Sequence, residues 1–413
     1  MLGGERIEGG VRVDAAKNAV LPILAASMLA DGDVTICGCP DIRDVHAMTG
    51  ILEKLGCESA WQGGDLTLRN CCLHNWEMPD DLFKQIRSSI FLLGPILGRL
   101  RRATVTYPGG CEIGLRPIDL HLKGLRALGV RIVDEGGILY CDGRDMRAGD
   151  VYFDYPSVGA TENVLMAAVL LDGVTTLHNA AREPEIEDLE RFINQMGGKV
   201  RGAGTQLIEV EGVKRLHGLR YTPIPDRIAA GTLLCAAAAT GGEISLANVR
   251  PVDLLPIGAK LQEMGCRILE EEDAMILQAP ERLSAFSRLQ TQPHPGFPTD
   301  MQPQMLAVSC VAKGTSVIEE NVFENRFTHV GSLTQMGANV RVSGRIAVVQ
   351  GVEQLHGVRV TARDLRGGAA LVLAGLCAHG ETVIENIEFI DRGYAHFEKT
   401  LSSLGAKIER VTV

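Results

Sequence analysis

The chain has 413 residues, of which 46% are hydrophobic and 22% are charged, a composition typical of a folded globular protein rather than a disordered one. Its formal net charge is −10 and only 4% of its residues are aromatic, which disfavours nucleic-acid binding, because such proteins need basic surfaces and often aromatic rings that stack on bases. The sequence contains neither an apolar run of about 18 residues, as a membrane span requires, nor a secretory signal, so we expect a cytoplasmic protein with no membrane partner.

One phrase recurs six times along the chain. It is an amphipathic helical stretch that ends in Leu-Gly or Met-Gly and leads into a short strand, at intervals of 68 to 73 residues. Glycine directly after a helix commonly adopts the left-handed conformation that ends it, so each phrase predicts the end of a helix. The six glycines are Gly56, Gly129, Gly197, Gly265, Gly337 and Gly405.

A full copy of the repeat contains two helices and four strands. Residues 151–212, for example, read as strand, Ala-rich helix, strand, amphipathic helix, strand and strand. The Ala-rich helix is apolar on all sides, which indicates burial inside a domain with sheets outside it. The sequence therefore predicts an α/β protein with six βαβαββ copies.

Six copies of about 70 residues suggest two domains of three copies each. The chain also starts with a predicted strand at residues 5–13 and ends with another at 407–413, and we expect both in one domain. This places the first domain at residues 17–225 and the second at 1–16 plus 226–413.

Chemically distinctive residues fall where the predicted buried helices begin. A helix N-terminus attracts anions through its unpaired N–H groups and its dipole, so these ends would form a phosphate site if they converged. The alternative for Ser157, Asp226 and Asp300 is an ordinary N-cap. The residues are Lys17, Asn18, Arg87, Ser157, Val158, Gly159, Asp226, Asp300 and Arg366.

The segment Pro108 to His121, PGGCEIGLRPIDLH, presents a cysteine after a turn-forming Pro-Gly-Gly run. Arg116 follows Cys111 by five residues, where its charge would favour a reactive thiolate. The alternative is that Cys111 is one of eleven inert, buried cysteines. We interpret His121 as a hydrogen-bonded structural histidine, and no cysteine pair has the spacing of a metal site.

Cations form a further set. Arg326 and Arg392 each follow a predicted strand in the second half of the chain, and the planar fork of arginine matches carboxylate and phosphate oxygens. A cationic pocket in an acidic protein suits a small polyanionic substrate. Its predicted members are Lys17, Arg87, Arg116, Arg326, Arg366 and Arg392.

Together these features closely resemble the UDP-N-acetylglucosamine 1-carboxyvinyltransferase family of enolpyruvyl transferases. The resemblance covers essentially the whole chain and rests on the six copies and on the segments AKNAVLP, PGGCEIGLRPIDLH, DYPSVGAT, AREPEI, PHPGFPTDMQ, FENRFTHV, DLRGGAALVLAG and IDRGY. It implies a two-domain inside-out α/β barrel with the active site in the cleft between domains. It also implies transfer of the enolpyruvyl group of phosphoenolpyruvate to the 3'-hydroxyl of UDP-N-acetylglucosamine in peptidoglycan synthesis, with no metal or cofactor. The sequence does not determine the oligomeric state, for which we expect a monomer.

The resemblance further implies roles for single residues. Cys111 would be the general acid and the target of the antibiotic fosfomycin, and Asp300 would be the base at the sugar hydroxyl. Lys17, Arg116 and Arg392 would hold phosphate and carboxylate, with Arg87, Arg326 and Arg366 around them. The sugar nucleotide would contact Asn18, Arg116, Pro117, Ile118, Asp119, Leu120, Ser157, Val158, Gly159 and Val322.

Two alternatives stay open, and the first of them rests on departures from the family pattern. Ala15-Ala16, Tyr155-Pro156, Ala229 and Gly367 stand where Ser-Gly, Lys-Val, Glu and Ala are common. They favour a low-activity or regulatory paralogue that binds the sugar nucleotide. The other alternative is 5-enolpyruvylshikimate-3-phosphate synthase, which shares the implied fold but has no cysteine in a PGGC loop.

Overall fold

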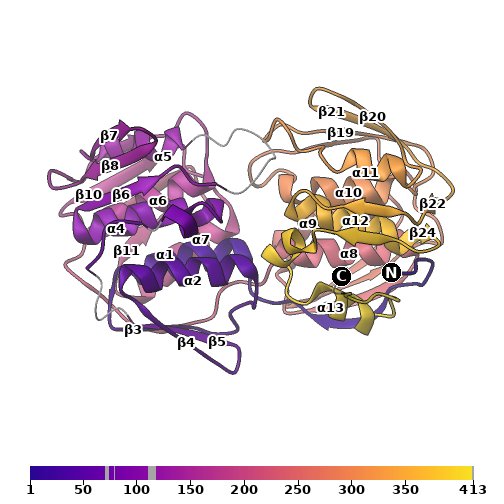
Figure 1. Ribbon diagram of the computed structural model, residues 1–413, viewed down its shortest axis with the longest axis horizontal. Helices are drawn as coiled ribbons and strands as arrows, with labels where there is room; N and C mark the ends of the chain where they lie inside the picture. The colour runs from indigo at the N-terminus through magenta and orange to yellow at the C-terminus, as the bar shows by residue number, and fades with distance from the viewer. Residues whose placement is uncertain (70–73, 79, 110–117, 412–413) are drawn as a thin grey trace. The chain divides into compact units, whose positions relative to one another are not determined.

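The computed structural model of the chain describes residues 1–69, 74–78, 80–109 and 118–411. These residues form two compact units (Figure 1). The first unit consists of residues 15–109 and 118–224, and the second of residues 1–14 and 225–411. Three predicted site residues, Cys111, Arg116 and Pro117, lie outside the described residues.

The first unit combines short sheets with helices. Its helices are α1 (Lys17–Ser27), α2 (Arg43–Leu55), α3 (Asp80–Phe83), η1 (Arg87–Leu92), α4 (Leu93–Leu100), α5 (Asp119–Ala127), α6 (Val158–Ala168) and α7 (Pro184–Gln195). Its strands are β2 (Ala30–Asp31), β3 (Asp33–Ile36), β4 (Glu58–Gln62), β5 (Asp65–Arg69), β6 (Arg102–Thr106), β7 (Arg131–Glu135), β8 (Ile138–Asp142), β9 (Asp150–Tyr152), β10 (Val174–His178), β11 (Lys199–Arg201), β12 (Leu207–Glu211), β13 (Leu216–His217) and β14 (Arg220–Tyr221). They pair in the orders β14-β3-β5-β4, β6-β8-β7, β11-β12-β10-β9 and β13-β2.

The second unit is built in the same manner. Its helices are α8 (Arg227–Thr240), α9 (Pro251–Glu263), η2 (Thr299–Met301), α10 (Gln302–Ser309), α11 (Val330–Gln335), α12 (Leu365–Cys377), η3 (Ile387–Arg392) and α13 (Phe397–Ser403). Its strands are β1 (Glu8–Arg12), β15 (Glu243–Ala247), β16 (Arg267–Glu270), β17 (Ala274–Gln278), β18 (Arg288–Gln290), β19 (Thr315–Glu319), β20 (Asn339–Ser343), β21 (Ile346–Gln350), β22 (Leu355–His356), β23 (Arg359–Thr361), β24 (Ala378–His379) and β25 (Val383–Glu385). They pair in the orders β1-β15-β17-β16, β18-β19-β21-β20, β22-β24 and β23-β25.

Parallel pairing at one sheet edge accounts for the place of the N-terminus. Strand β1 lies parallel to β15, so the first residues of the chain belong to the second unit together with its C-terminal part (Figure 1). Parallel edge pairs also join β9 to β10, β14 to β3 and β18 to β19, each next to an antiparallel hairpin. The same local pattern thus recurs in both units.

Buried helices form the core of each unit. Most residues of α1, α4 and α6 are buried in the first unit, as are those of α8, α10 and α12 in the second. These sequences are rich in Ala, Gly and Leu, so they can be packed on every side. The strands instead alternate, as in β21, where Ala347 and Val349 are buried between exposed neighbours. The predicted α/β class is confirmed, and no described helix is long and apolar enough to span a membrane.

The six predicted helix ends are confirmed as well. Gly56, Gly129, Gly197, Gly265, Gly337 and Gly405 all have positive φ angles, between 92° and 110°. A residue with a Cβ rarely adopts this conformation, which is why glycine stands at each of these ends.

The predicted C-terminal strand is wrong for its described residues. Residues 408–411 form no strand, and Lys407 makes only an isolated bridge to Leu2. Arg410 donates instead to Asp391 at 2.7 Å and to Glu398 at 3.1 Å. A strand needs a neighbour that pairs with its backbone along its length, whereas here side-chain ion pairs hold the segment.

A glycine allows two buried helices of the first unit to approach closely. A Cβ atom on Gly94 of α4 would lie 2.1 Å from the backbone oxygen of Asn163 on α6. We predict that Gly94→Ala lowers the free energy of unfolding of this unit by ~1–3 kcal/mol, the usual cost of overpacking. Urea unfolding followed by tryptophan fluorescence measures this unit, because both tryptophans of the chain, Trp61 and Trp76, lie in it.

The matched control is Gly149→Ala in the same unit. A Cβ on Gly149 would meet no atom within 4 Å and φ is not positive there, so the change is expected to be neutral or slightly stabilising. Equal losses in the two variants would contradict the packing explanation.

Candidate active site

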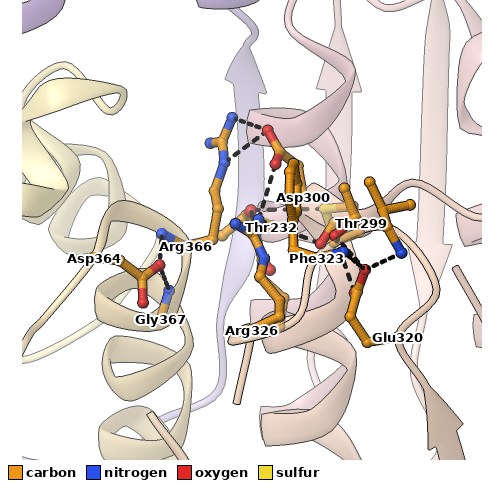
Figure 2. Close-up of polar contacts among 12 residues, drawn as sticks. Thr232, Thr299, Asp300, Glu320, Phe323, Arg326, Asp364, Arg366 and Gly367 are labelled. Carbon is orange, nitrogen blue, oxygen red and sulfur yellow. Dashed lines mark hydrogen bonds and ion pairs between the residues drawn. The ribbon is translucent and has the colours of Figure 1, made fainter. Parts of the chain in front are cut away.

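A carboxylate between two arginines forms the centre of the candidate site in the second unit (Figure 2). Asp300 lies in η2, directly before α10. Its Oδ1 accepts a hydrogen bond from Arg326 Nη2 at 2.8 Å, and its Oδ2 accepts from Arg366 Nη2 at 3.0 Å and Nε at 3.2 Å. The arginine side chains are 2% and 3% exposed, whereas Asp300 is 25% exposed. Two buried cations therefore share one carboxylate that solvent can reach.

The charges of this cluster stabilise one another. Burial alone would lower the pKa of Arg366, but the attraction of Asp300, with further contributions from Tyr394 and Asp226, raises it above the usual value. Charge-assisted hydrogen bonds from two guanidinium groups likewise favour the ionised form of Asp300.

Glu320, which the sequence analysis missed, orients the turn that carries Asp300. The Thr299 hydroxyl donates to both carboxylate oxygens of Glu320 at 3.0 Å (Figure 2). Glu320 Oε1 also accepts from the N–H groups of Val322 and Phe323 at 2.9 and 3.0 Å. One buried side chain thus connects the residue before Asp300 with Val322, a predicted substrate-binding residue. No motif distinguishes Glu320 from the acidic residues around it.

Asp364, also missed, caps the helix that carries Arg366. Its Oδ1 accepts from the N–H groups of Arg366 and Gly367 at 3.0 and 2.9 Å (Figure 2). Its Oδ2 accepts from the Thr328 hydroxyl at 3.0 Å. The glycine departure at position 367 suits this cap, because a Cβ there would lie 2.6 Å from Asp364 Oδ2. An aspartate just before an apolar helix is an N-cap signal that could have revealed this residue.

In the first unit a buried ion pair holds Lys17. The lysine is the first residue of α1, and its Nζ lies 2.8 Å from Oδ2 of Asp44, in the first turn of α2. Both side chains are buried, and a buried ammonium group needs such a partner. Sequence reasoning did not identify Asp44, because nothing near it in the chain marks it as the partner of Lys17.

His121 brings several predicted segments of the first unit together. It lies in the first turn of α5, directly after residues 118–120. A Cβ atom on Gly159 would lie 3.1 Å from Cε1 of His121, so the start of α6 packs against this ring. Arg87 lies near enough to influence its charge. Ile118, Asp119 and Leu120 therefore lie in the same region as Arg87 and the predicted residues Ser157, Val158 and Gly159.

The protonation state of His121 follows from its contacts. Its Nδ1 lies 2.9 Å from Nδ2 of Asn163, a donor, so Nδ1 is the acceptor and carries no proton. Burial, and to a lesser extent the charge of Arg87, lower the pKa of His121 to about 3. The interpretation of His121 as a hydrogen-bonded structural histidine is confirmed.

Two of the three expected N-caps are present. The Ser157 hydroxyl accepts from the N–H of Ala160 at 3.4 Å, and Asp226 accepts from the N–H groups of Ile228 and Ala229 at 2.8 Å. The carboxylate of Asp300 accepts hydrogen bonds from Arg326 and Arg366.

The remaining predicted residues occupy the ends of elements. Asn18 is the second residue of α1, Arg87 is the first of η1, and Arg392 is the last of η3. Arg87 Nη1 donates to the backbone oxygen of Pro108 at 3.4 Å. A joint site built by residues of both units stays a prediction. Within the described part of the chain, no three His, Cys, Asp or Glu side chains could hold a metal ion together.

Comparisons with known proteins cover the full chain. A family model described as EPSP synthase (3-phosphoshikimate 1-carboxyvinyltransferase) matches residues 1–401. A protein of Caldanaerobacter subterraneus subsp. tengcongensis named UDP-N-acetylglucosamine 1-carboxyvinyltransferase 2 is 49% identical, covering 99% of this chain and 98% of the relative. A protein of Symbiobacterium thermophilum named UDP-N-acetylglucosamine 1-carboxyvinyltransferase 1 is 51% identical, covering 99% and 94%.

Solved structures share the fold. The enolpyruvyl transferase NikO of Streptomyces tendae superimposes with a TM-score of 0.89 at 24% identity, covering 98% of this chain and 97% of that one. An EPSP synthase of Acinetobacter baumannii gives a TM-score of 0.74 at 17% identity, with the same coverage.

The neutral, buried state of His121 predicts a pH effect on stability. In the unfolded chain His121 takes up a proton with a pKa near 6.5. In the folded protein its pKa is about 3. Acid therefore favours the unfolded chain, and stability falls as the pH drops through this window. Between pH 7.5 and 5.0 we expect wild type to lose ~2 kcal/mol more than His121→Asn, measured by urea unfolding with tryptophan fluorescence.

The control is His217→Asn, at an exposed histidine of the same unit, which should show the wild-type pH dependence. A His121→Asn curve parallel to wild type would contradict the assigned neutral state.

Proposed function

The chain belongs to the EPSP synthase family of enolpyruvyl transferases, and on this basis we propose that it transfers the enolpyruvyl group of phosphoenolpyruvate to the 3'-hydroxyl of UDP-N-acetylglucosamine, releasing phosphate. The observation that carries the proposal is the full-length identity of about half to relatives named UDP-N-acetylglucosamine 1-carboxyvinyltransferase. We further propose that this reaction is a step of peptidoglycan synthesis and that it takes place in the cytoplasm.

The reaction is an addition followed by an elimination. In the addition, the sugar hydroxyl oxygen bonds to C2 of phosphoenolpyruvate, the hydroxyl proton passes to Asp300, and the Cys111 thiol protonates C3. In the elimination, C3 gives a proton back to the Cys111 thiolate and the bond between C2 and the phosphate oxygen breaks, so that phosphate leaves with the electron pair of that bond. Proton transfers of this kind each contribute about 10²–10⁴-fold to a rate.

The arrangement around Asp300 supports its role as the base. Arg326 and Arg366 fix both oxygens of the carboxylate and keep it ionised, as a proton acceptor must be. Because Asp300 is the exposed member of the cluster, it is the group that a substrate hydroxyl can approach. In this proposal Arg326 and Arg366 orient the base. This role is more specific than the one predicted from the sequence, in which they are two of six cations that line a pocket.

The remaining cations suit the two charged ends of phosphoenolpyruvate. Lys17, Arg116 and Arg392 bind its phosphate and carboxylate in this proposal, and Arg87 contributes further positive charge. Residues 118–120 and 157–159 bind the sugar nucleotide together with Asn18 and Val322. The packing of Gly159 on His121 supports this grouping, because it joins the two segments. Fixed cations supply the charge stabilisation that the developing anion needs.

We also infer that the two units are the three-repeat halves of an inside-out α/β barrel. Three buried helices in each unit and the similarity to enolpyruvyl transferase structures support this inference. A monomer is expected, because each chain contains all the residues of the proposed site.

The first test is phosphate release from phosphoenolpyruvate with UDP-N-acetylglucosamine as acceptor. We expect release that depends on the sugar nucleotide and falls at least ~100-fold in Cys111→Ala, because the general acid is lost. Shikimate 3-phosphate, the acceptor of EPSP synthases, is expected to support none. A phosphate assay under identical conditions compares the two acceptors directly.

Two outcomes would contradict the proposal. Release with shikimate 3-phosphate alone would identify an EPSP synthase. Tight binding of UDP-N-acetylglucosamine without release would identify a non-catalytic paralogue, the alternative that the departures at Ala15, Ala16 and Ala229 keep open.

A second test addresses the base. Asp300→Asn keeps the shape of the side chain but can neither take up a proton nor offset the charges of Arg326 and Arg366, so we expect kcat to fall ~10²–10⁴-fold. The Kd of UDP-N-acetylglucosamine, measured by calorimetry, should change by less than ~3-fold. The matched control, Asp273→Asn at an exposed position of the same unit, should retain full activity. Retention of wild-type kcat in Asp300→Asn would remove this residue from the mechanism.

A further inference from the structure

Tyr394 connects the three buried helices of the second unit. Its side chain is only 5% exposed, and its hydroxyl lies 2.9 Å from Oγ1 of Thr232 on α8 and 3.3 Å from Nε2 of Gln304 on α10. The third neighbour is Arg366 of α12, whose guanidinium carbon lies 5.5 Å from the centre of the ring. A single buried side chain thus contacts α8, α10 and α12 near their N-terminal ends.

The directions of these hydrogen bonds are determined by the available protons. Thr232 donates its hydroxyl proton to the backbone oxygen of Ile228 at 2.8 Å, and it accepts from Gln304 Nε2 at 3.0 Å. The Tyr394 hydroxyl must therefore donate to Thr232, and it accepts from Gln304. Removing the hydroxyl would leave two buried polar groups without one of their partners, a loss that buried networks tolerate poorly.

The same tyrosine is attached to the turn that carries Arg392. Helix η3 ends at Arg392, and the N–H groups of Gly393 and Tyr394 both donate to the backbone oxygen of Ile390 at 3.1 Å. On the other side of Arg392, Asp391 accepts from both terminal nitrogens of Arg410 at 2.7 and 3.1 Å. Along the chain, Arg392 thus lies between Asp391, which forms an ion pair with Arg410, and the buried Tyr394.

We propose that Tyr394 is a positioning residue that fixes Arg392 relative to the pair of Arg366 and Asp300. These groups contact one another in series. Arg366 donates a hydrogen bond to Asp300 and packs on the Tyr394 ring. The N–H group of Tyr394 in turn donates to Ile390, in the turn that contains Arg392. A cation acts on a reacting group only from a defined place, and a displacement of about 1 Å can cost ~10²-fold in rate. The inference rests on the proposed function, in which Arg392 binds phosphoenolpyruvate.

The test begins with Tyr394→Phe, which keeps the ring that lies against Arg366 but removes the hydroxyl, together with the influence of that hydroxyl on Arg366. We expect kcat/KM for phosphoenolpyruvate to fall ~10-fold, while the Kd of UDP-N-acetylglucosamine changes less than ~2-fold. Thr232→Val removes the same hydrogen bond from α8 and should reproduce this selective loss, and it takes the place of Tyr394→Phe if that variant does not fold. Tyr140→Phe, at an exposed tyrosine of the first unit, is the matched control and should equal wild type.

A double-mutant cycle distinguishes positioning of Arg392 from general support of the fold. In an Arg392→Ala background, Tyr394→Phe should lower kcat/KM for phosphoenolpyruvate by less than ~2-fold, because the group that it positions is gone. An unchanged ~10-fold loss in that background, or equal losses toward both substrates, would overturn the proposal while leaving the proposed function intact. Absence of turnover in wild type would overturn the proposed function, and this inference with it.

Discussion

Two guanidinium groups lie buried in the second unit, and each needs a negative partner, since an uncompensated buried charge costs several kcal/mol. Asp300 is that partner for both, and its position depends on three separate segments. Glu320 holds the turn of Asp300 through Thr299, and Asp364 holds the start of the helix that presents Arg366. The most exposed member of the cluster is therefore also the most constrained, which is the condition that a catalytic carboxylate must meet.

The first unit solves a similar problem with different residues. Lys17 starts a buried helix and pairs with Asp44 on the next helix, while His121 stays neutral beside Arg87 and so avoids repulsion. In both units, a cation at the start of a helix pairs with an acidic side chain, as Lys17 and Arg366 do. Arg87 instead has a neutral histidine, His121, as its neighbour rather than a second positive charge. A protein of net charge −10 can thus maintain local positive charge for a small anion without a basic surface.

The repeat explains why the functional residues are found where they are. The buried helices are mainly apolar, and the charged residues of the candidate site lie at or next to their first turns, where the backbone itself leaves N–H groups unpaired. Such ends carry Lys17, Asp226, Asp300 and Arg366. Tyr394 contacts three buried helices, α8, α10 and α12, near their N-terminal ends. Buried helices of both units therefore offer similar positions on which different side chains can specialise.

The sequence by itself determined the α/β class, the six helix ends and the burial of the Ala-rich helices, because glycine conformation and apolar pattern are local properties. It also indicated Asp300, Arg326 and Arg366 as members of a site. Only the tertiary structure decided that the three contact one another, across 26 and 66 positions of sequence. Asp364 carried a local N-cap signal, whereas Asp44 and Glu320 escaped prediction, and the C-terminal strand failed, because the partner of a charge or of a strand is chosen by proximity in space, which no local pattern among 51 acidic residues encodes.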